Sequence, residues 1–163
     1  MEQTNRMLAQ FGALAKQQSA EKLLALNPQT AAYGLTLSPS QASALAETQA
    51  ESLKKAGRIE LGGHLCEQLV LAFCDSPYLD AASYEQTLHE LVEGFYLFKN
   101  ETFDVLSDKA VLCFMRDAFD HLCGGSTDQL FGTVLPELAR HLTSGGTLGS
   151  YLEEKRREAQ EDA

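Results

Sequence analysis

The sequence lacks any run of apolar residues long enough to cross a membrane. A membrane-spanning helix needs about 20 mainly apolar residues in succession, so the chain is predicted not to enter a membrane. Residues 1–6 also lack the basic and then apolar pattern of a secretory signal peptide. A cytoplasmic location is therefore expected, where the four cysteines are expected to be free thiols rather than a disulfide framework.

Basic residues are scarce in the middle of the chain. Over 163 residues, 13 basic and 23 acidic residues give a formal net charge of −10. Residues 60–137 hold fourteen acidic and three basic residues, whereas residues 1–59 have a net charge of +2. Binding to nucleic acid needs a basic patch that meets the phosphates, so nucleic acid is not an expected partner. An acidic surface would instead attract a basic protein partner.

Long runs of β-branched residues are missing as well, so no sheet is predicted. Apolar residues instead recur every three or four positions, which is typical of amphipathic helices. The sequence therefore predicts an all-α fold, a single compact bundle of about six or seven helices. Residues 1–150 are expected to form one helical domain, and residues 151–163 a polar C-terminal helix that frays.

Two prolines mark changes in the helical pattern. The first helix should end near Pro28, because the residue before a proline avoids the helical conformation. Pro136 lies inside a helical pattern and predicts a kink, since its ring would crowd the carbonyl group of Gly132. The first helix carries a stripe of apolar residues: Met7, Leu8, Phe11, Leu14 and Ala15.

Other helix ends are indicated by capping residues. The predicted N-caps are four serines, three of which precede a glutamine by three residues, as in a capping box: Ser38, Ser83, Ser107 and Ser126. Gly57 is expected to form a left-handed C-terminal cap. Asn100 is expected to take the left-handed conformation after the helix that begins at Ser83.

A repeated tripeptide suggests a metal site. His-Leu-Cys occurs twice and supplies four candidate zinc ligands: His64, Cys66, His121 and Cys123. The Cys-x-x-Cys spacing of most zinc sites is missing, and residues two apart on a helix point in different directions. The favoured interpretation is that the cysteines are small apolar residues and that no cofactor is bound.

Each histidine follows a carboxylate by four residues, which on a helix places an acid beside the ring. The predicted pairs are Glu60–His64, Glu85–His89, Asp117–His121 and Glu137–His141. Di-iron bundles need a spacing of three instead, and no histidine has it. The pairs are therefore interpreted as ordinary contacts on helix surfaces.

Two connecting segments combine aromatic and ionisable residues, as recognition sites often do. They supply six candidate binding residues: Asp75, Tyr78, Tyr96, Lys99, Asn100 and Glu101. The alternative interpretation is structural, with Asp75 capping a turn and Lys99 interacting with a helix dipole. No nucleophile elbow and no phosphate-binding loop occurs, so no catalytic residue is predicted.

Four segments together resemble a family of uncharacterised bacterial proteins. They are YGLTLS at 33–38, GRIELGG at 57–63, AFCDSPY at 72–78 and FYLFKNE at 95–101. The similarity spans about residues 31–140. The family is associated with anaerobic Firmicutes and carries a domain-of-unknown-function label, so the resemblance implies a bacterial cytoplasmic protein and no particular activity.

Two hypotheses for the function stay open at this point. In the first, the protein is an interaction or adaptor module that uses its acidic surface to dock a protein partner or its own copy. In the second, it is an enzyme or a small-ligand or metal-binding protein, with a site near Asp75 and Tyr78 or at the His-Leu-Cys tripeptides. The missing catalytic signatures favour the first.

Overall fold

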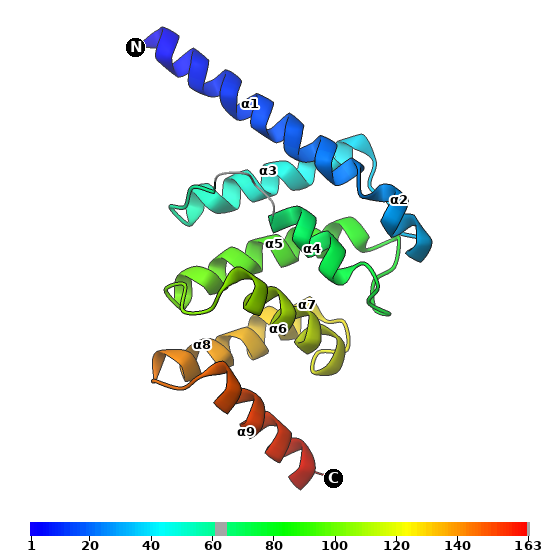
Figure 1. Ribbon diagram of the computed structural model, residues 1–163, viewed down its shortest axis with the longest axis vertical. Coiled ribbons are helices and arrows are strands. Elements are labelled where there is room, and N and C mark those ends of the chain that lie inside the picture. The colour runs from blue at the N-terminus through cyan, green and yellow to red at the C-terminus, as the bar shows by residue number, and fades with distance from the viewer. Residues whose placement is uncertain (61–64, 163) are drawn as a thin grey trace. The chain divides into compact units, whose positions relative to one another are not determined.

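The computed structural model describes residues 1–60 and 65–162, and within them every regular element is a helix (Figure 1). Seven helices in these ranges have nine residues or more: α1 (Glu2–Leu24), α3 (Pro39–Lys55), α4 (Leu65–Phe73), α5 (Tyr84–Glu101), α6 (Asp108–His121), α8 (Leu135–Thr143) and α9 (Leu148–Glu161). The shorter elements are α2 (Asn27–Thr30), η1 (Ala31–Tyr33), α7 (Thr127–Gln129) and η2 (Leu130–Val134). The predicted all-α fold is confirmed.

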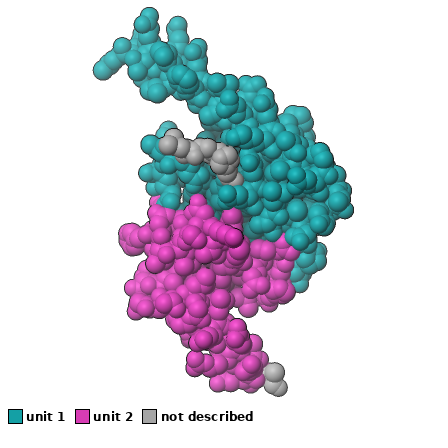
Figure 2. Space-filling model, in the orientation of Figure 1, with its two compact units in different colours: residues 1–96 teal, residues 97–163 magenta. Residues whose placement is uncertain are grey.

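The chain divides into two compact units, Met1–Tyr96 and Leu97–Ala163, which Figure 2 colours separately. In the first unit α1 packs against α3, and α4 contacts both. The fully buried side chains there include Leu45, Leu69, Phe73, Leu88, Leu91 and Phe95. The predicted domain boundary at residue 150 stays a prediction.

In the second unit α6 packs against η2, and α8 contacts η2 and α9. Its buried side chains include Phe114, Met115, Phe119, Leu130, Leu138 and Tyr151. Tyr151 belongs to α9, and its ring lies 5.9 Å from the ring of Phe114 in α6, in an edge-to-face arrangement. The first turn of the polar C-terminal helix is therefore held in the core of this unit.

The ends of α3 confirm the predicted caps. The Gln41 N–H donates to Ser38 Oγ at 3.1 Å, and the Ser38 N–H donates to Gln41 Oε1 at 2.8 Å. At the other end Gly57 is left-handed, and the next N–H, of Arg58, donates to the Leu53 carbonyl at 2.9 Å. This six-residue closure is a Schellman motif, which satisfies carbonyl groups that the helix itself leaves without donors.

The other predicted N-caps have different outcomes. Ser107 and Ser126 each accept a hydrogen bond from the backbone N–H three residues later, as predicted. The capping box predicted at Ser83 and Gln86 is wrong. The Ser83 hydroxyl donates to Asp80 Oδ1 at 3.0 Å, and the Gln86 side chain donates to a glutamate one turn later.

Where a kink is predicted at Pro136, the helix instead widens in the turn before the proline. Residues Leu130–Val134 form a π-helix, and α8 begins at Leu135 with the proline in its first turn. The Leu135 N–H donates to the carbonyl of Leu130, five residues back instead of four. A proline has no N–H and crowds the carbonyl four residues earlier, so a locally wider helix relieves both problems.

The end of α5 differs from the prediction, which placed the left-handed residue at Asn100. The helix continues to Glu101, and the left-handed residues are Phe103, with φ 52°, and Asp104, with φ 57°. The Asp104 N–H donates to the Lys99 carbonyl at 2.9 Å, which closes another Schellman motif. The position that usually holds glycine is occupied here by Phe103, whose side chain is 86% exposed.

We expect Phe103→Gly to be more stable than Phe103→Ala by about 1 kcal/mol, because a left-handed residue with a Cβ atom clashes with its own backbone. Urea unfolding followed by circular dichroism measures the difference. Both variants lose the exposed ring, so the comparison isolates the backbone conformation. Equal stabilities would show that residue 103 is not held in the left-handed region.

Candidate functional site

The first pair of predicted binding residues lies in the segment between α4 and α5. Asp75 and Tyr78 are both exposed, and both belong to the first unit. Between them Ser76 is buried, and its hydroxyl accepts a hydrogen bond from the Tyr78 N–H at 3.3 Å. The segment is thus a compact turn that presents Asp75 and Tyr78 to solvent, and the two stay candidates for binding.

Tyr96 has a different environment, because it is buried within the first unit. Its hydroxyl donates to Glu60 Oε2 at 2.8 Å and accepts from Gln49 Nε2 at 3.4 Å. Burial raises the pKa of Tyr96 far above its ordinary value, and the Glu60 carboxylate adds to this effect. Tyr96 therefore connects α5 to Gln49 of α3 and to the segment after α3.

Lys99 is also buried, in the second unit, where it organises the turn between α5 and α6. Its ammonium donates to the Leu106 carbonyl at 2.6 Å and lies 2.8 Å from Asp108 Oδ1 and 3.3 Å from Asp104 Oδ1. The predicted neighbours Asn100 and Glu101 are exposed. The three contacts of Lys99 fix the turn that contains the left-handed residues.

Of the four candidate metal ligands, Cys66 belongs to the first unit, and His121 and Cys123 belong to the second. His64 lies outside the described residues. Burial, with Glu60 and Glu67 nearby, raises the pKa of Cys66 to about 12, and burial also raises the pKa of Cys123. A thiol binds metal as the thiolate, which a raised pKa disfavours. Across residues 1–60 and 65–162, no group of three or more His, Cys, Asp or Glu side chains is arranged to hold a metal ion.

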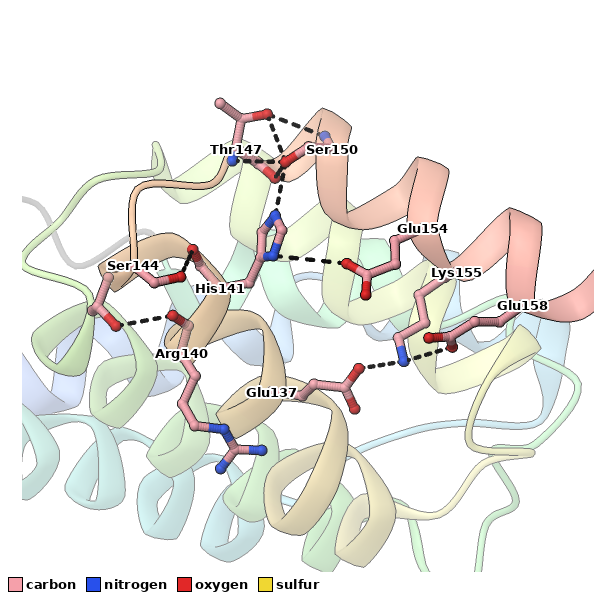
Figure 3. Close-up of polar contacts among 10 residues, drawn as sticks. Glu137, Arg140, His141, Ser144, Thr147, Ser150, Glu154, Lys155 and Glu158 are labelled. Atoms are coloured by element: carbon pink, nitrogen blue, oxygen red, sulfur yellow. Dashed lines mark hydrogen bonds and ion pairs between the residues drawn. The ribbon is translucent and has the colours of Figure 1, made fainter.

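The predicted carboxylate–histidine pairs are confirmed in two cases, at 3.5 and 3.7 Å: Glu85–His89 and Asp117–His121. The pair Glu60–His64 includes a residue outside the described ranges. The pair Glu137–His141 is wrong, because Glu137 forms an ion pair with Lys155 of α9 instead (Figure 3). Lys155, from another helix, thus takes the place that was predicted for His141, one turn away on the same helix.

His141 itself connects α8 to the first turns of α9 (Figure 3). Its Nε2 atom lies 2.7 Å from Ser150 Oγ, and its Nδ1 atom lies 3.9 Å from Glu154 Oε2. A hydroxyl, an imidazole and a carboxylate in this order are the components of a serine hydrolase triad. Ser150 Oγ, however, also accepts the Thr147 N–H at 3.0 Å within the capping box of α9. The Ser150 hydroxyl is thus part of the N-terminal cap of α9.

The same three kinds of group recur at His89 in the first unit. Its Nδ1 atom lies 2.6 Å from Thr48 Oγ1 of α3, and its Nε2 atom lies 3.5 Å from Glu85 Oε1. In both units the histidine bonds to a hydroxyl on a neighbouring helix. An arrangement that appears at two separate helix contacts favours a structural role, and we refer to both as histidine links.

A group of exposed residues on α1 has no such structural role. Every residue from 1 to 15 is exposed, and the N-terminal half of α1 extends beyond α3 (Figure 1). Four large apolar side chains in this part are 56, 64, 63 and 50% exposed, and we name them the outer stripe: Met7, Leu8, Phe11 and Leu14. The sequence pattern identifies this stripe, but such a stripe normally faces a core.

The outer stripe points away from α3 because α1 has a second apolar face. Ala20 is buried, and it follows Phe11 by about two and a half helical turns, which places the two residues on opposite sides. On the α3 side lie two open grooves of about 330 and 730 Å³, lined in α1 mainly by small and polar residues. None of the four outer-stripe residues lines either groove. The small residues Ala9, Gly12 and Ala13, spaced three and four positions apart on one helix face, are the sequence signal that could have revealed this orientation.

We expect Lys99→Met to lower the free energy of unfolding by about 2 kcal/mol, because the Leu106 carbonyl and two half-exposed carboxylates lose their cation. Lys109→Met is the matched control, since Lys109 lies on the exposed surface of α6. Chemical denaturation of both variants measures the effect. Equal losses in the two variants would contradict a structural role for Lys99.

The histidine link at His141 depends on Gly146. A Cβ atom at that position would lie 2.3 Å from His141 Nε2, so Gly146→Ala forces the ring away from Ser150. We expect a loss of about 1 kcal/mol, the contribution of a typical hydrogen bond. In a His141→Ala background the same substitution should cost almost nothing. Thermal unfolding of the four proteins tests this, and an unchanged cost in both backgrounds would contradict it.

No helix of the described chain is both long and apolar enough to span a bilayer.

Comparison with known proteins identifies the family. No curated protein and no solved structure matches the chain. A family of unknown function, DUF6323, matches residues 22–147, a range that contains His141 and Gly146 and begins after the outer stripe. The resemblance to an uncharacterised domain family is thereby confirmed, whereas the quoted motifs and the Firmicutes origin stay predictions. The chain belongs to the DUF6323 family.

Proposed function

We propose that the protein is a protein–protein interaction module that docks a partner on the outer stripe of α1. The observation that carries this proposal is the exposure of four large apolar side chains on the helix face opposite α3. An exposed apolar patch of this kind costs free energy in water and typically marks an interaction surface.

The stability of α1 supports the same conclusion. Residues 2–15 are helical yet exposed, so this half of the helix gains little from packing within its own chain. Isolated helices of about this length are only marginally stable in water, and Gly12 lowers the helix propensity further. A partner that covers the outer stripe would supply the missing packing energy.

The acidic surface expected from the sequence contributes less than its charge suggests. Several of its carboxylates have partners within the chain. Asp104 and Asp108 contact Lys99, Asp120 lies 2.7 Å from Arg116 Nε, and Glu137 pairs with Lys155. The remaining negative charge would steer a basic partner from a distance. Docking on the acidic surface, a cytoplasmic location and a bacterial origin stay predictions.

The alternative function, an enzyme or a small-ligand or metal-binding protein, also stays a prediction. Its sites would lie near Asp75 and Tyr78 or at the His-Leu-Cys tripeptides. The exposed turn that holds Asp75 and Tyr78 and the raised thiol pKa values of Cys66 and Cys123 give this function less support than the outer stripe gives to docking.

Photo-crosslinking tests the proposed surface. With benzoylphenylalanine in place of Phe11, irradiation of the cells that produce the protein should yield a crosslink to one defined protein, identified by mass spectrometry. When a lysate is irradiated at raised salt, the same crosslink should still form, because apolar contacts are not screened as charges are. The control position is Asn5, which is exposed and lies about a third of a turn from Phe11 around the helix axis. Equal crosslinking from both positions would refute the proposal.

A further inference from the structure

We propose that the partner of the outer stripe is a second copy of this chain, with the two α1 helices antiparallel about a two-fold axis near Phe11. This inference rests on the proposed function of the stripe and names its occupant. In such an interface the same patch of both copies meets, so the patch has to be complementary to itself.

The charges of α1 meet this requirement. With 3.6 residues per turn, Arg6 and Lys16 each lie about 140° around the axis from Phe11, and Glu2 lies about 180° away. All three are on the half of the helix that faces away from the stripe, and Lys16 pairs with Glu47 of α3 at 2.9 Å. Lys22 lies about 20° from Phe11 around the axis but falls beyond the end of the stripe, so the two outer stripes themselves meet without bringing like charges together.

The residues beside the stripe are neutral and can pair with themselves. One edge carries Gln3, Gln10 and Gln17, and all three are exposed. A glutamine amide both donates and accepts hydrogen bonds, so a glutamine of one copy can bond to a glutamine of the other. A partner chosen by charge would instead need a rim of charged residues. Between residues 3 and 15 the only charged residue is Arg6, which lies on the far side of the helix.

The rest of the chain also makes α1 the most favourable place for two copies to meet. The net charge of −10 repels a second copy, but this charge is concentrated in residues 60–137, and residues 1–59 have a net charge of +2. Contact through α1 therefore brings together the least repulsive parts of the two chains.

The antiparallel orientation follows from pairing and charge together. With Phe11 on the axis, Phe11 meets its own copy, Leu8 faces Leu14, and Met7 faces Ala15. Every large apolar residue of the stripe is then opposite another apolar residue. Opposed helix dipoles attract each other, and the acidic bodies of the two copies lie toward opposite ends of the helix pair. A parallel pair would place these bodies side by side.

The size of the stripe sets the expected affinity. Each half-exposed large side chain offers about 100 Å² of apolar surface, so two stripes together bury on the order of 1,000 Å² with their rims. Interfaces of this size lie at the low end for specific complexes. We therefore expect a reversible dimer with a dissociation constant in the micromolar range.

Sedimentation velocity of the purified full chain, from about 1 to about 300 μM, tests this affinity range. A reversible monomer–dimer equilibrium that persists at raised salt is expected. Phe11→Glu should weaken dimerisation at least about 10-fold, because it places two carboxylates together on the axis. Asn5→Glu adds the same charge about a third of a turn from Phe11, on the side of the helix without the glutamines, and should leave the dimer intact. Circular dichroism confirms that both variants fold.

A protein that is monomeric over the whole range, or a dimer that Phe11→Glu leaves unchanged, overturns the inference. In either case a crosslink from position 11 to a different protein would still support the proposed function, so the two failures are distinguishable. A second crosslink tests whether the two α1 helices are antiparallel. Benzoylphenylalanine in place of Gln3 should crosslink near Ser19 of the second copy, whereas a crosslink near residue 3 would overturn the antiparallel arrangement.

Discussion

The packing of α1 against α3 determines which face of α1 is free. Small side chains at the contact, such as Ala20, let the two helix backbones approach closely, and the burial of Ala20 and Leu23 sets the rotation of α1 about its axis. The ion pair between Lys16 and Glu47 is half exposed and adds little. Once that rotation is fixed, Phe11 and its neighbours have to point into solvent. The exposed stripe is thus the consequence of a contact on the opposite side of the same helix, and the proposed function depends on that contact.

Polar residues between helices serve mainly as connections in this protein. A polar group that loses water is costly unless it has a hydrogen-bond partner, so the buried Lys99 and Tyr96 and the partly buried His141 each bond to groups on a neighbouring turn or helix. The same residue types also occur in binding and catalytic sites. This overlap explains why Lys99 and Tyr96 had the sequence signature of a recognition site, although the structure buries both.

The features that the sequence predicted correctly are local ones. The caps at Ser38, Ser107 and Ser126 are each completed by a residue three positions away, so their chemistry is contained in a short segment. The error at Ser83 is also local, because Asp80 lies only three residues away, whereas the error at His141 arises because Lys155 of another helix takes Glu137. The orientation of α1 belongs to this second class. Periodicity shows which residues share a helix face, but it does not show which of two apolar faces meets the core.

Charge and apolar surface act over different distances in this chain. The net charge of −10 acts over about one Debye length and opposes association wherever two acidic surfaces approach. The outer stripe acts only on contact, and the charged residues nearest to it point away from it. Negative charge therefore restricts the places where another molecule can bind, and the neutral face of α1 is left as the favourable one. Because the DUF6323 match begins at residue 22, the proposed binding element is attached to the family's helical region and does not belong to the matched part. Its specificity then depends on how α1 is held against α3, rather than on the chemistry of the family's core.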